Sequence, residues 1–433
     1  MELDLPLDQP VEEKDWPRVV EYCENDVKAT EAVLEAQWQD YVARQILAAL
    51  SGLSMNDTTP RHTAKIIFGD DRNPQQHFVY TDLSEVFSGY KFDAGKSSYR
   101  DENPGEGGYV YAEPGIYEQV ALLDVASMHP TSLVLLNLFG KYTSRFAELV
   151  EARVAIKRKD YKRARSLLGG VLGEFLVGAE TNPANSEALA YALKIAINIV
   201  YGLTSASFDN PFRDVRNKDN IVAKRGALYM INLKHDIQDE GWRVVHIKTD
   251  SVKIPNATPE SIEFVLAHGP QWGYQFEHEK TFDTLCLVND AVYIARSGAE
   301  WTAVGSQFQH PYVFKTLFTG QELVFDDYCE ARSVLQGTMY LDKEEYEQGE
   351  DLNHRRMRHI GRTGRFVPVV QGGGTLYRVK DDKYYAVSGT KGYRWMDAET
   401  AQHIPDLQID MTYFVKLADA AVKTIEQFGS FKE

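Results

Sequence analysis

Apolar residues run without a polar interruption from Val120 to Leu123, and a single carboxylate, Asp124, follows them. A run of this kind is typical of a strand that is buried on both faces. Because proline cannot continue a strand, we expect this one to end before Pro130. An acid at the end of a buried strand pays a desolvation cost unless a cation lies beside it. The simpler interpretation of Asp124, taken alone, is a helix N-cap.

A second stretch, rich in β-branched residues, runs from Val244 to Ile254 and is divided by Thr249 and Asp250. This pattern predicts a β-hairpin with Asp250 at its tip. Two carboxylates at adjacent strand ends can hold two divalent metal ions about 3.5–4 Å apart, the arrangement used for phosphoryl transfer. Asp124 and Asp250 are therefore a candidate metal centre.

The stretch from Leu193 to Ala206 has the period of an α-helix. Lys194, Asn198 and Tyr201 fall at i, i+4 and i+7, so they share one helical face. These side chains suit a nucleotide, through a phosphate, a polar edge and a ring or sugar. An ordinary amphipathic helix with three surface residues is the alternative.

Helical periods predict three further helices, over residues 12–50, 146–168 and 411–429. Alternation of apolar and polar residues predicts strands over 276–298 and 376–395. Residues 51–104, rich in Ser, Asp, Asn and Gly, are expected to form a connecting or accessory region. The mixture of elements predicts an α+β chain.

The composition is that of a soluble globular protein, because 43% of the 433 residues are hydrophobic and 25% are charged. A chain of this length forms about two to four domains. No run of about 18 apolar residues occurs, so we expect no membrane span, and the acidic first 20 residues are unlike a secretory leader. Cys23, Cys286 and Cys329 are widely spaced and indicate a reducing compartment.

The net charge of −16 counts against a nucleic-acid partner, but two basic tracts stand out from it. Residues 153–165 hold seven Lys or Arg and one acid. A second tract has five arginines and no acid: Arg355, Arg356, Arg358, Arg362 and Arg365. An acidic body with two basic tracts fits a protein that grips DNA in a groove, and a solvated helix or loop is the alternative for each tract.

Three short stretches resemble the motifs of family B DNA polymerases, and they occur in the family's order. DVASMHP, from Asp124, resembles motif A, usually D-x-x-S-L-Y-P; KIAINIVYG, from Lys194, resembles motif B, K-x-x-x-N-S-x-Y-G. KTDS, from Lys248, resembles motif C, usually D-T-D-S. Lys248 replaces the first Asp of motif C, and His129 replaces the Tyr of motif A.

The resemblance covers residues 105–320 well and implies a right-hand polymerase with an antiparallel-sheet palm, two-helix fingers and a mixed α/β thumb. A helical remnant of an exonuclease domain would precede them. The implied domains are an exonuclease remnant (1–50), a connecting region (51–104), palm (105–146 and 204–310), fingers (147–203) and thumb (311–433).

The resemblance also implies roles for individual residues. Asp124 and Asp250 would be the catalytic acids and would hold two Mg²⁺ ions, with Mn²⁺ as a substitute and the Val125 carbonyl as a further ligand. The implied nucleotide-binding residues are Arg153, Lys157, Lys194, Asn198, Ser127, His129 and Tyr201. The implied DNA contacts are Gly107, Gly108, Gly202, Tyr293 and the five arginines of the second basic tract.

Near the N-terminus, Tyr22 and Asp26 form Y-x-x-x-D, which resembles the third motif of the DnaQ-like 3′–5′ exonuclease. The Asp-x-Glu of that exonuclease's first strand does not precede them. We therefore expect that the chain alone has no exonuclease activity and that its first 50 residues pack against a second polypeptide carrying the missing acids. A trimmed chain or a relic of a lost nuclease is the alternative.

The expected function is a template-directed DNA polymerase that extends a primer 3′-hydroxyl on primer–template DNA with dNTPs, in a bacterial or phage-infected cytoplasm. One alternative is a non-catalytic primer–template-binding subunit with a polymerase fold. A second is an RNA polymerase or reverse transcriptase, whose palms usually carry paired acids at the motif C turn. This chain has a Thr-Asp-Ser turn there.

Overall fold

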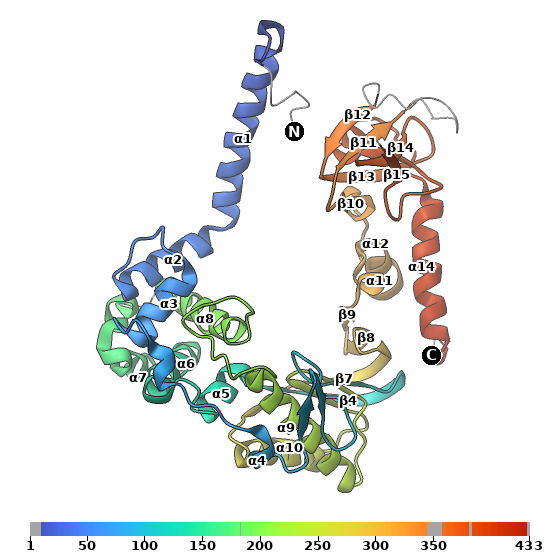
Figure 1. Cartoon of the computed structure of the whole chain (residues 1–433). Helices are drawn as coiled ribbons and strands as arrows, with labels where there is room; N and C mark the ends of the chain where they lie inside the picture. The colour runs from blue at the N-terminus through green and yellow to red at the C-terminus, as the bar shows by residue number, and fades with distance from the viewer. Residues whose placement is uncertain (1–9, 182, 344–356, 381–382, 431–433) are drawn as a thin grey trace. The chain divides into compact units, whose positions relative to one another are not determined.

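The computed structural model describes residues 10–181, 183–343, 357–380 and 383–430 (Figure 1). The chain divides into two compact units, Leu34–Asp290 and Met1–Val33 together with Ala291–Glu433. The structure thus confirms an α+β chain with antiparallel sheets. The finer division into palm, fingers and thumb stays a prediction, and its boundary at residue 310 differs from the division between the two units.

The first unit is built on an antiparallel sheet whose strands lie in the order β3-β5-β6-β4-β7. Their bounds are β3 Val110–Ala112, β4 Gly115–Val125, β5 His246–Lys248, β6 Ser251–Ile254 and β7 Phe276–Asn289. Residues Val120 to Leu123 are all buried in the central strand β4, as the uninterrupted apolar run predicts. β5 and β6 form the predicted hairpin.

Two long helices, α9 (Ile221–Asp239) and α10 (Pro259–Gln271), pack against each other, and α10 also contacts β4 and β7. α9 approaches the short helix α5 (Met128–Leu135) at Gly226. A Cβ atom at Gly226 would lie 2.6 Å from Sδ of Met128. The absence of a side chain there lets the two helices come together.

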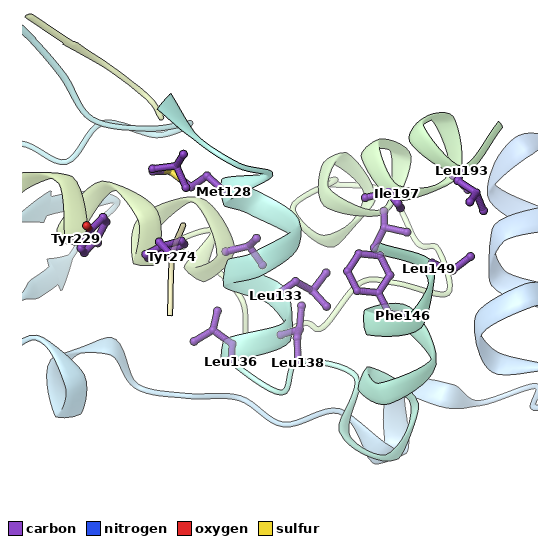
Figure 2. Close-up of a cluster of buried hydrophobic side chains, with 14 of the residues drawn as sticks. Met128, Leu133, Leu136, Leu138, Phe146, Leu149, Leu193, Ile197, Tyr229 and Tyr274 are labelled. Atoms are coloured by element: carbon purple, nitrogen blue, oxygen red, sulfur yellow. The ribbon is translucent and has the colours of Figure 1, made fainter. Parts of the chain in front are cut away.

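α5 connects the sheet to a group of helices (Figure 2). Its apolar residues lie between Tyr229 and Tyr274 on one side and Phe146 and Ile197 on the other. The neighbouring helices are α2 Trp38–Ser51, α3 Thr59–Phe68, α6 Thr143–Lys157, α7 Tyr161–Ser166 and α8 Ala184–Thr204. One hydrophobic core therefore runs from the sheet into the helical group.

The helix predicted over residues 146–168 is wrong in its length. α6 ends at Lys157, Lys159 has a left-handed φ of 60°, and α7 begins after Asp160. The side chain of Asp160 accepts a hydrogen bond from the N–H of Arg163, which is the geometry of a helix N-cap. This cap begins a new helix where the apolar period alone suggested a continuous one.

Residues 51–104 pack on the core of the first unit. The ring of Phe68 contacts the rings of Phe139 and Phe212, with centroids 5.3 and 5.2 Å apart. The elements here are α3, a 3₁₀ helix Pro74–His77, α4 Leu83–Val86, β1 Lys91–Asp93 and β2 Lys96–Ser98; 3₁₀ helices Gly140–Tyr142 and Leu168–Leu176 follow later in this unit. β1 and β2 form an antiparallel hairpin.

The second unit contains two antiparallel sheets, β10-β13-β16 and β12-β11-β14-β15, and confirms the strands and terminal helix predicted near the C-terminus. The strand bounds are β8 Val292–Ser297, β9 Glu300–Val304, β10 Glu330–Ser333, β11 Thr338–Asp342, β12 Arg358–Gly361, β13 Thr363–Val369, β14 Thr375–Lys380, β15 Lys383–Ala386 and β16 Arg394–Asp397. The helices are a 3₁₀ turn Glu13–Asp15, α1 Trp16–Ala36, α11 Ser306–Gln309, α12 Pro311–Phe314, a π-helical turn Lys315–Thr319, a 3₁₀ turn Phe325–Tyr328, α13 Ala398–Gln402 and α14 Met411–Glu426. The helix predicted over residues 12–50 is divided into α1 and α2.

By length and composition, α8 is the one helix in the described ranges that meets the criteria for a membrane span. It packs against α2 and α6, and residues such as Leu189, Leu193 and Ile197 are buried in the core. The core helix of a folded domain meets the same criteria.

Candidate active site

The two predicted acids lie at neighbouring strand ends. The N–H of Val125, the last residue of β4, donates to the carbonyl of Asp250 at 2.9 Å, and Asp124 pairs in register with Ser251 of β6. Thr249 has a φ of 58°, which makes the hairpin tip tight. The N-cap alternative for Asp124 is wrong, because α5 begins after Ser127.

A cavity of about 650 Å³ opens beside these acids and brings together residues from β4, α6, α8 and the β5–β6 hairpin. Of the residues predicted to bind metal or nucleotide, eight line it: Asp124, Val125, Ser127, Arg153, Lys157, Lys194, Asn198 and Asp250. α6 and α8 pack through their apolar faces, so their cationic residues meet at the same cavity. The spacing of the motifs in the sequence therefore corresponds to one place in the fold.

Sequence analysis missed two further acids of the cavity, Glu277 and Glu279. They lie on β7, which pairs with β4 so that Glu277 is opposite Asp124. A signal was present, because acids at i and i+2 share one face of a strand. The register that brings this strand beside Asp124 could not be deduced from local sequence.

Negative charge is concentrated on one side of the cavity, where Asp124, Asp250, Glu277 and Glu279 lie together. Burial, together with the neighbouring carboxylates of Asp250, Glu279 and Glu277, raises the pKa of Asp124 to about 7. Burial and Glu279 also raise the pKa of the Asp250 carboxyl. Lys253 opposes this charge, but it is 2% exposed and burial lowers its pKa to about 8.

These acids fit a divalent cation. Carboxylate oxygens are the ligands that Mg²⁺ prefers, and an uncompensated group of acids is stabilised when a cation binds. Within residues 10–430, apart from the undescribed segments, no cluster of three or more His, Cys, Asp or Glu side chains has the geometry of a metal site. Mg²⁺ commonly takes one or two carboxylates and completes its shell with water and substrate phosphates, so the Asp124–Asp250 pair is sufficient.

The cations lie on the helices across the cavity. Arg153 and Lys157 are one turn apart on α6, and Lys194 is on α8. Arg153 is half-buried, and burial lowers its pKa, but a guanidinium stays charged in proteins. Lys157 and Lys194 are exposed. The cavity therefore has an acidic wall and a basic wall.

Two predicted nucleotide-binding residues, His129 and Tyr201, do not line the cavity. Their rings stack on each other, with centroids 4.0 Å apart and planes 6° apart. Burial lowers the pKa of His129, and its Nδ1 has no hydrogen-bond partner among the described residues. The stack joins α5 to the C-terminal half of α8.

The three predicted glycines differ in their surroundings. A Cβ at Gly108 would lie 2.8 Å from Cγ2 of Thr249, so Gly108 packs directly against the hairpin tip. A Cβ at Gly107 or at Gly202 would meet no atom within 4 Å. Close packing against Thr249 accounts for a glycine at position 108, whereas Gly107 and Gly202 lie at an open surface without side chains of their own.

The remaining predicted residues belong to the second unit. Arg358 pairs with Asp397 at 2.6 Å and Arg365 pairs with Asp326 at 3.2 Å, so acids partly neutralise the second basic tract. Arg362 lies between β12 and β13, Tyr293 lies in β8, and Tyr22 and Asp26 lie in α1. Arg355 and Arg356 fall outside the described residues.

No protein-family model matches the chain, and no curated protein matches it. Among solved structures, the chain is similar to the family B DNA polymerase from the hyperthermophilic archaeon Pyrobaculum calidifontis, with a TM-score of 0.47 and 14% sequence identity. The alignment covers 96% of this chain and 57% of that chain. The chain therefore spans little more than half the length of the archaeal polymerase.

Proposed function

We propose that the chain is a template-directed DNA polymerase of the family B type, which adds dNTPs to a primer 3′-hydroxyl on primer–template DNA. The observation that carries the proposal is a single cavity with Asp124 and Asp250 on one side and Arg153, Lys157 and Lys194 on the other. Such a cavity suits a triphosphate whose α-phosphate is attacked beside the acids. Its volume of about 650 Å³ is in the usual range for a small-molecule site.

The chain's own residues would bind and orient the nucleotide. Arg153 offers a planar pair of donors to phosphate oxygens, and Lys157 and Lys194 add point charges. Asn198 presents an amide on the same face of α8, one turn beyond Lys194. Ser127 adds a hydroxyl beside Asp124. These contacts neutralise the phosphates and hold the sugar and base in one position.

Asp124 and Asp250, with the carbonyl of Val125, would hold two Mg²⁺ ions, or Mn²⁺ in their place. When bound, such ions supply activation of the primer hydroxyl and stabilisation of the charge on the leaving pyrophosphate. Burial and the neighbouring acids raise the pKa of Asp124, and a bound cation would offset both effects. Lys253, which is buried beside these groups, offsets part of the negative charge of the two carboxylates.

The proposal extends to DNA. Gly107, Gly108 and Gly202 would let the template backbone approach closely. Tyr293 and the arginines of the second basic tract would contact the duplex backbone. The stack of His129 on Tyr201, between α5 and α8, would support the nascent base pair. The three cysteines are free, which fits the proposed location in a bacterial or phage-infected cytoplasm.

Primer extension with Mg²⁺ tests the proposal. Asp124→Asn and Asp250→Asn should each reduce extension by about 10³-fold or more while primer–template affinity stays near that of the wild type, because the acids serve the chemistry and basic residues bind DNA. Asp239→Asn is the matched control, since Asp239 is an exposed acid at the end of α9. An acid variant that retains extension within about tenfold of wild type would contradict the proposal.

The same assay separates the alternatives. A wild-type chain that binds primer–template but extends it with no nucleotide is a non-catalytic subunit. Extension with rNTPs in preference to dNTPs, or on RNA templates in preference to DNA, would indicate an RNA polymerase or a reverse transcriptase. Each outcome requires only the purified chain and a labelled primer.

A further inference from the structure

The tip of the β5–β6 hairpin, which carries Asp250, has a strained backbone. Thr249 has a φ of 58°, a conformation that β-branched residues rarely adopt. Backbone of this kind persists only where the surrounding structure fixes it, and it is often found at functional sites. The position of Asp250 therefore depends on contacts that reach the tip from outside the hairpin.

Two residues directly before β3 make such contacts. The carbonyl of Tyr109 accepts a hydrogen bond from the N–H of Thr249 at 2.9 Å. A Cβ atom at Gly108 would lie 2.8 Å from Cγ2 of Thr249, so the backbone of Gly108 lies directly against the threonine side chain. On its other side, the tip is bonded to β4, because the N–H of Val125 donates to the carbonyl of Asp250.

The hydroxyl of Tyr109 belongs to a network of charged groups, which we call the Glu102 network. Tyr109 is 2% exposed, and its hydroxyl donates to a carboxylate oxygen of Glu102. Lys234, which is 5% exposed, donates to the same oxygen at 2.6 Å and to the Tyr109 hydroxyl at 2.9 Å. Nε2 of His235 lies 2.7 Å from the other oxygen. Burial opposes the charge of Glu102, but the hydrogen bonds from these three partners outweigh burial and lower its pKa.

The Glu102 network joins the segment before β3 to α9, which is a firm support. Every residue of α9 from Ile221 to Lys234 is buried. Two further hydrogen bonds attach the same segment to this helix: Lys224 donates to the carbonyl of Gly105, and the hydroxyl of Tyr99 donates to Asn232 at 2.8 Å. The segment is therefore fixed at several points along α9 before it reaches the hairpin tip.

None of Glu102, Tyr109 and Lys234 lines the Asp124–Asp250 cavity, so they have no direct contact with a nucleotide there. A buried ion pair is also weak evidence for stability, because the cost of desolvation offsets the attraction between its charges. A precise position is a different matter, since Mg²⁺ demands near-ideal octahedral geometry and metal ligands have to be held within about 0.5 Å of it. The Glu102 network fixes the backbone next to Asp250 and so meets this requirement.

We propose that Glu102, Tyr109 and Lys234 are positioning residues that hold the hairpin tip, and with it Asp250, where the carboxylate can share a metal ion with Asp124. The inference rests on the part of the proposed function that makes Asp124 and Asp250 metal ligands. Tyr109 connects the two ends of the arrangement, because its carbonyl holds Thr249 and its hydroxyl joins the Glu102 network.

The test is the binding of Mn²⁺ to the purified chain, followed by the electron paramagnetic resonance signal of the free ion, without nucleotide or DNA. Tyr109→Phe is the decisive variant, because it removes only the hydroxyl and keeps the ring and the carbonyl. The Kd for Mn²⁺ should rise by about tenfold, the lower end of the effect of groups that orient metal ligands. Glu102→Gln keeps the shape of the side chain but not its charge, and it should also raise this Kd. Asp250→Asn should abolish the binding.

Tyr90→Phe is the matched control. Tyr90 is 6% exposed and its hydroxyl donates to Oδ2 of Asp219 at 3.0 Å, so this variant also loses a buried hydrogen bond from a tyrosine to a carboxylate. Within the described part of the chain, neither Tyr90 nor Asp219 is hydrogen-bonded to the β5–β6 hairpin. Both tyrosine variants should lower the Tm by similar amounts, and only Tyr109→Phe should raise the Kd for Mn²⁺.

Primer extension gives a second readout that a purely structural role would not change. Tyr109→Phe should need about tenfold more Mg²⁺ than the wild type for a half-maximal rate. At saturating Mg²⁺, its KM for dNTP and its Kd for primer–template should equal those of the wild type, because the cations that line the cavity are unchanged.

Three results would overturn the inference. A wild-type Kd for Mn²⁺ in Tyr109→Phe means that the Glu102 network serves stability alone. A rise of the same size in Tyr90→Phe means that metal binding responds to any loosening of this unit. Mn²⁺ binding that Asp250→Asn leaves unchanged means that the ion does not bind at the hairpin tip. A chain that binds Mn²⁺ as expected but extends no primer would refute the polymerase function and would still support the positioning role of the Glu102 network.

Discussion

At the scale of single residues, Asp124 shows how a functional site departs from the most stable arrangement. Its carboxylate is partly buried beside Asp250 and Glu279, and its pKa is raised from 3.8 to about 7. The folded state therefore binds a proton that the unfolded state releases. Stability from this group is fully present below pH 3.8 and is lost as the pH rises to about 7.

Asp124→Asn should consequently raise the Tm of the metal-free protein at pH 8 by a few degrees, because the neutral amide removes the charge that the fold disfavours. At pH 4 the two proteins should have equal Tm values, since Asp124 is then protonated. Thermal unfolding in EDTA at both pH values provides the measurement. Mg²⁺ should raise the Tm of the wild type at pH 8 and leave that of the variant nearly unchanged.

The cations of the same cavity allow a second prediction. Lys194→Ala and Arg153→Ala should each raise the KM for dNTP and slow incorporation. In each variant kcat/KM should fall by about 10- to 100-fold, as expected for the loss of one charge-assisted contact. Lys162→Ala is the control, because Lys162 belongs to the same basic tract but is exposed and does not line the cavity. Single-turnover kinetics separate the two effects. A change in DNA affinity alone would assign Arg153 and Lys194 to the template groove.

At the scale of elements, patterns among neighbouring residues predicted the strand, the helix and the hairpin that carry the motifs. The apolar run of β4, the interruption at Thr249 and the helical face of α8 are each properties of neighbouring residues. Sequence analysis missed Glu277 because its place beside Asp124 depends on the pairing of β7 with β4. The break before α7 had a local signal in Asp160, but the apolar period obscured it.

Two helical glycines give an element-scale prediction. Gly226→Ala on α9 should lower the Tm, because the new methyl group overlaps the side chain of Met128. Overpacking of this kind costs about 1–3 kcal/mol. Alanine gains roughly 1 kcal/mol over glycine in a helix, which does not offset that cost. Gly202→Ala on α8 is the same change in open space and should leave the Tm equal or higher. Equal shifts of the same sign in thermal unfolding would show that α5 and α9 can separate without loss.

At the scale of the whole molecule, α1 stands out because none of its residues is buried. It exposes Trp16, Val20, Val27 and Val33 by 55–67%. Apolar surface of this extent on one helix is typical of an interface. We expect this face, on the helix that carries Tyr22 and Asp26, to pack against another polypeptide.

We expect the chain to show no 3′–5′ excision of a mismatched primer in the presence of Mg²⁺ while it still extends a matched one, because no group of three or more acids near Asp26 in the described ranges has the geometry of a metal site. A labelled primer with a terminal mismatch provides the measurement. Efficient excision that Asp26→Ala abolishes would contradict the expectation and would place a complete nuclease within this chain.

The helix α8 has one further consequence. Because α8 carries Lys194 and Asn198, which line the Asp124–Asp250 cavity, and Tyr201, which stacks on His129, the geometry of the helix fixes the spacing of these side chains. A substitution changes one side chain, but adding a residue between Asn198 and Tyr201 moves every later side chain of the helix by about 1.5 Å along the axis and turns it by about 100°. Mutational tolerance along this segment should therefore be broad for exchanges and narrow for insertions.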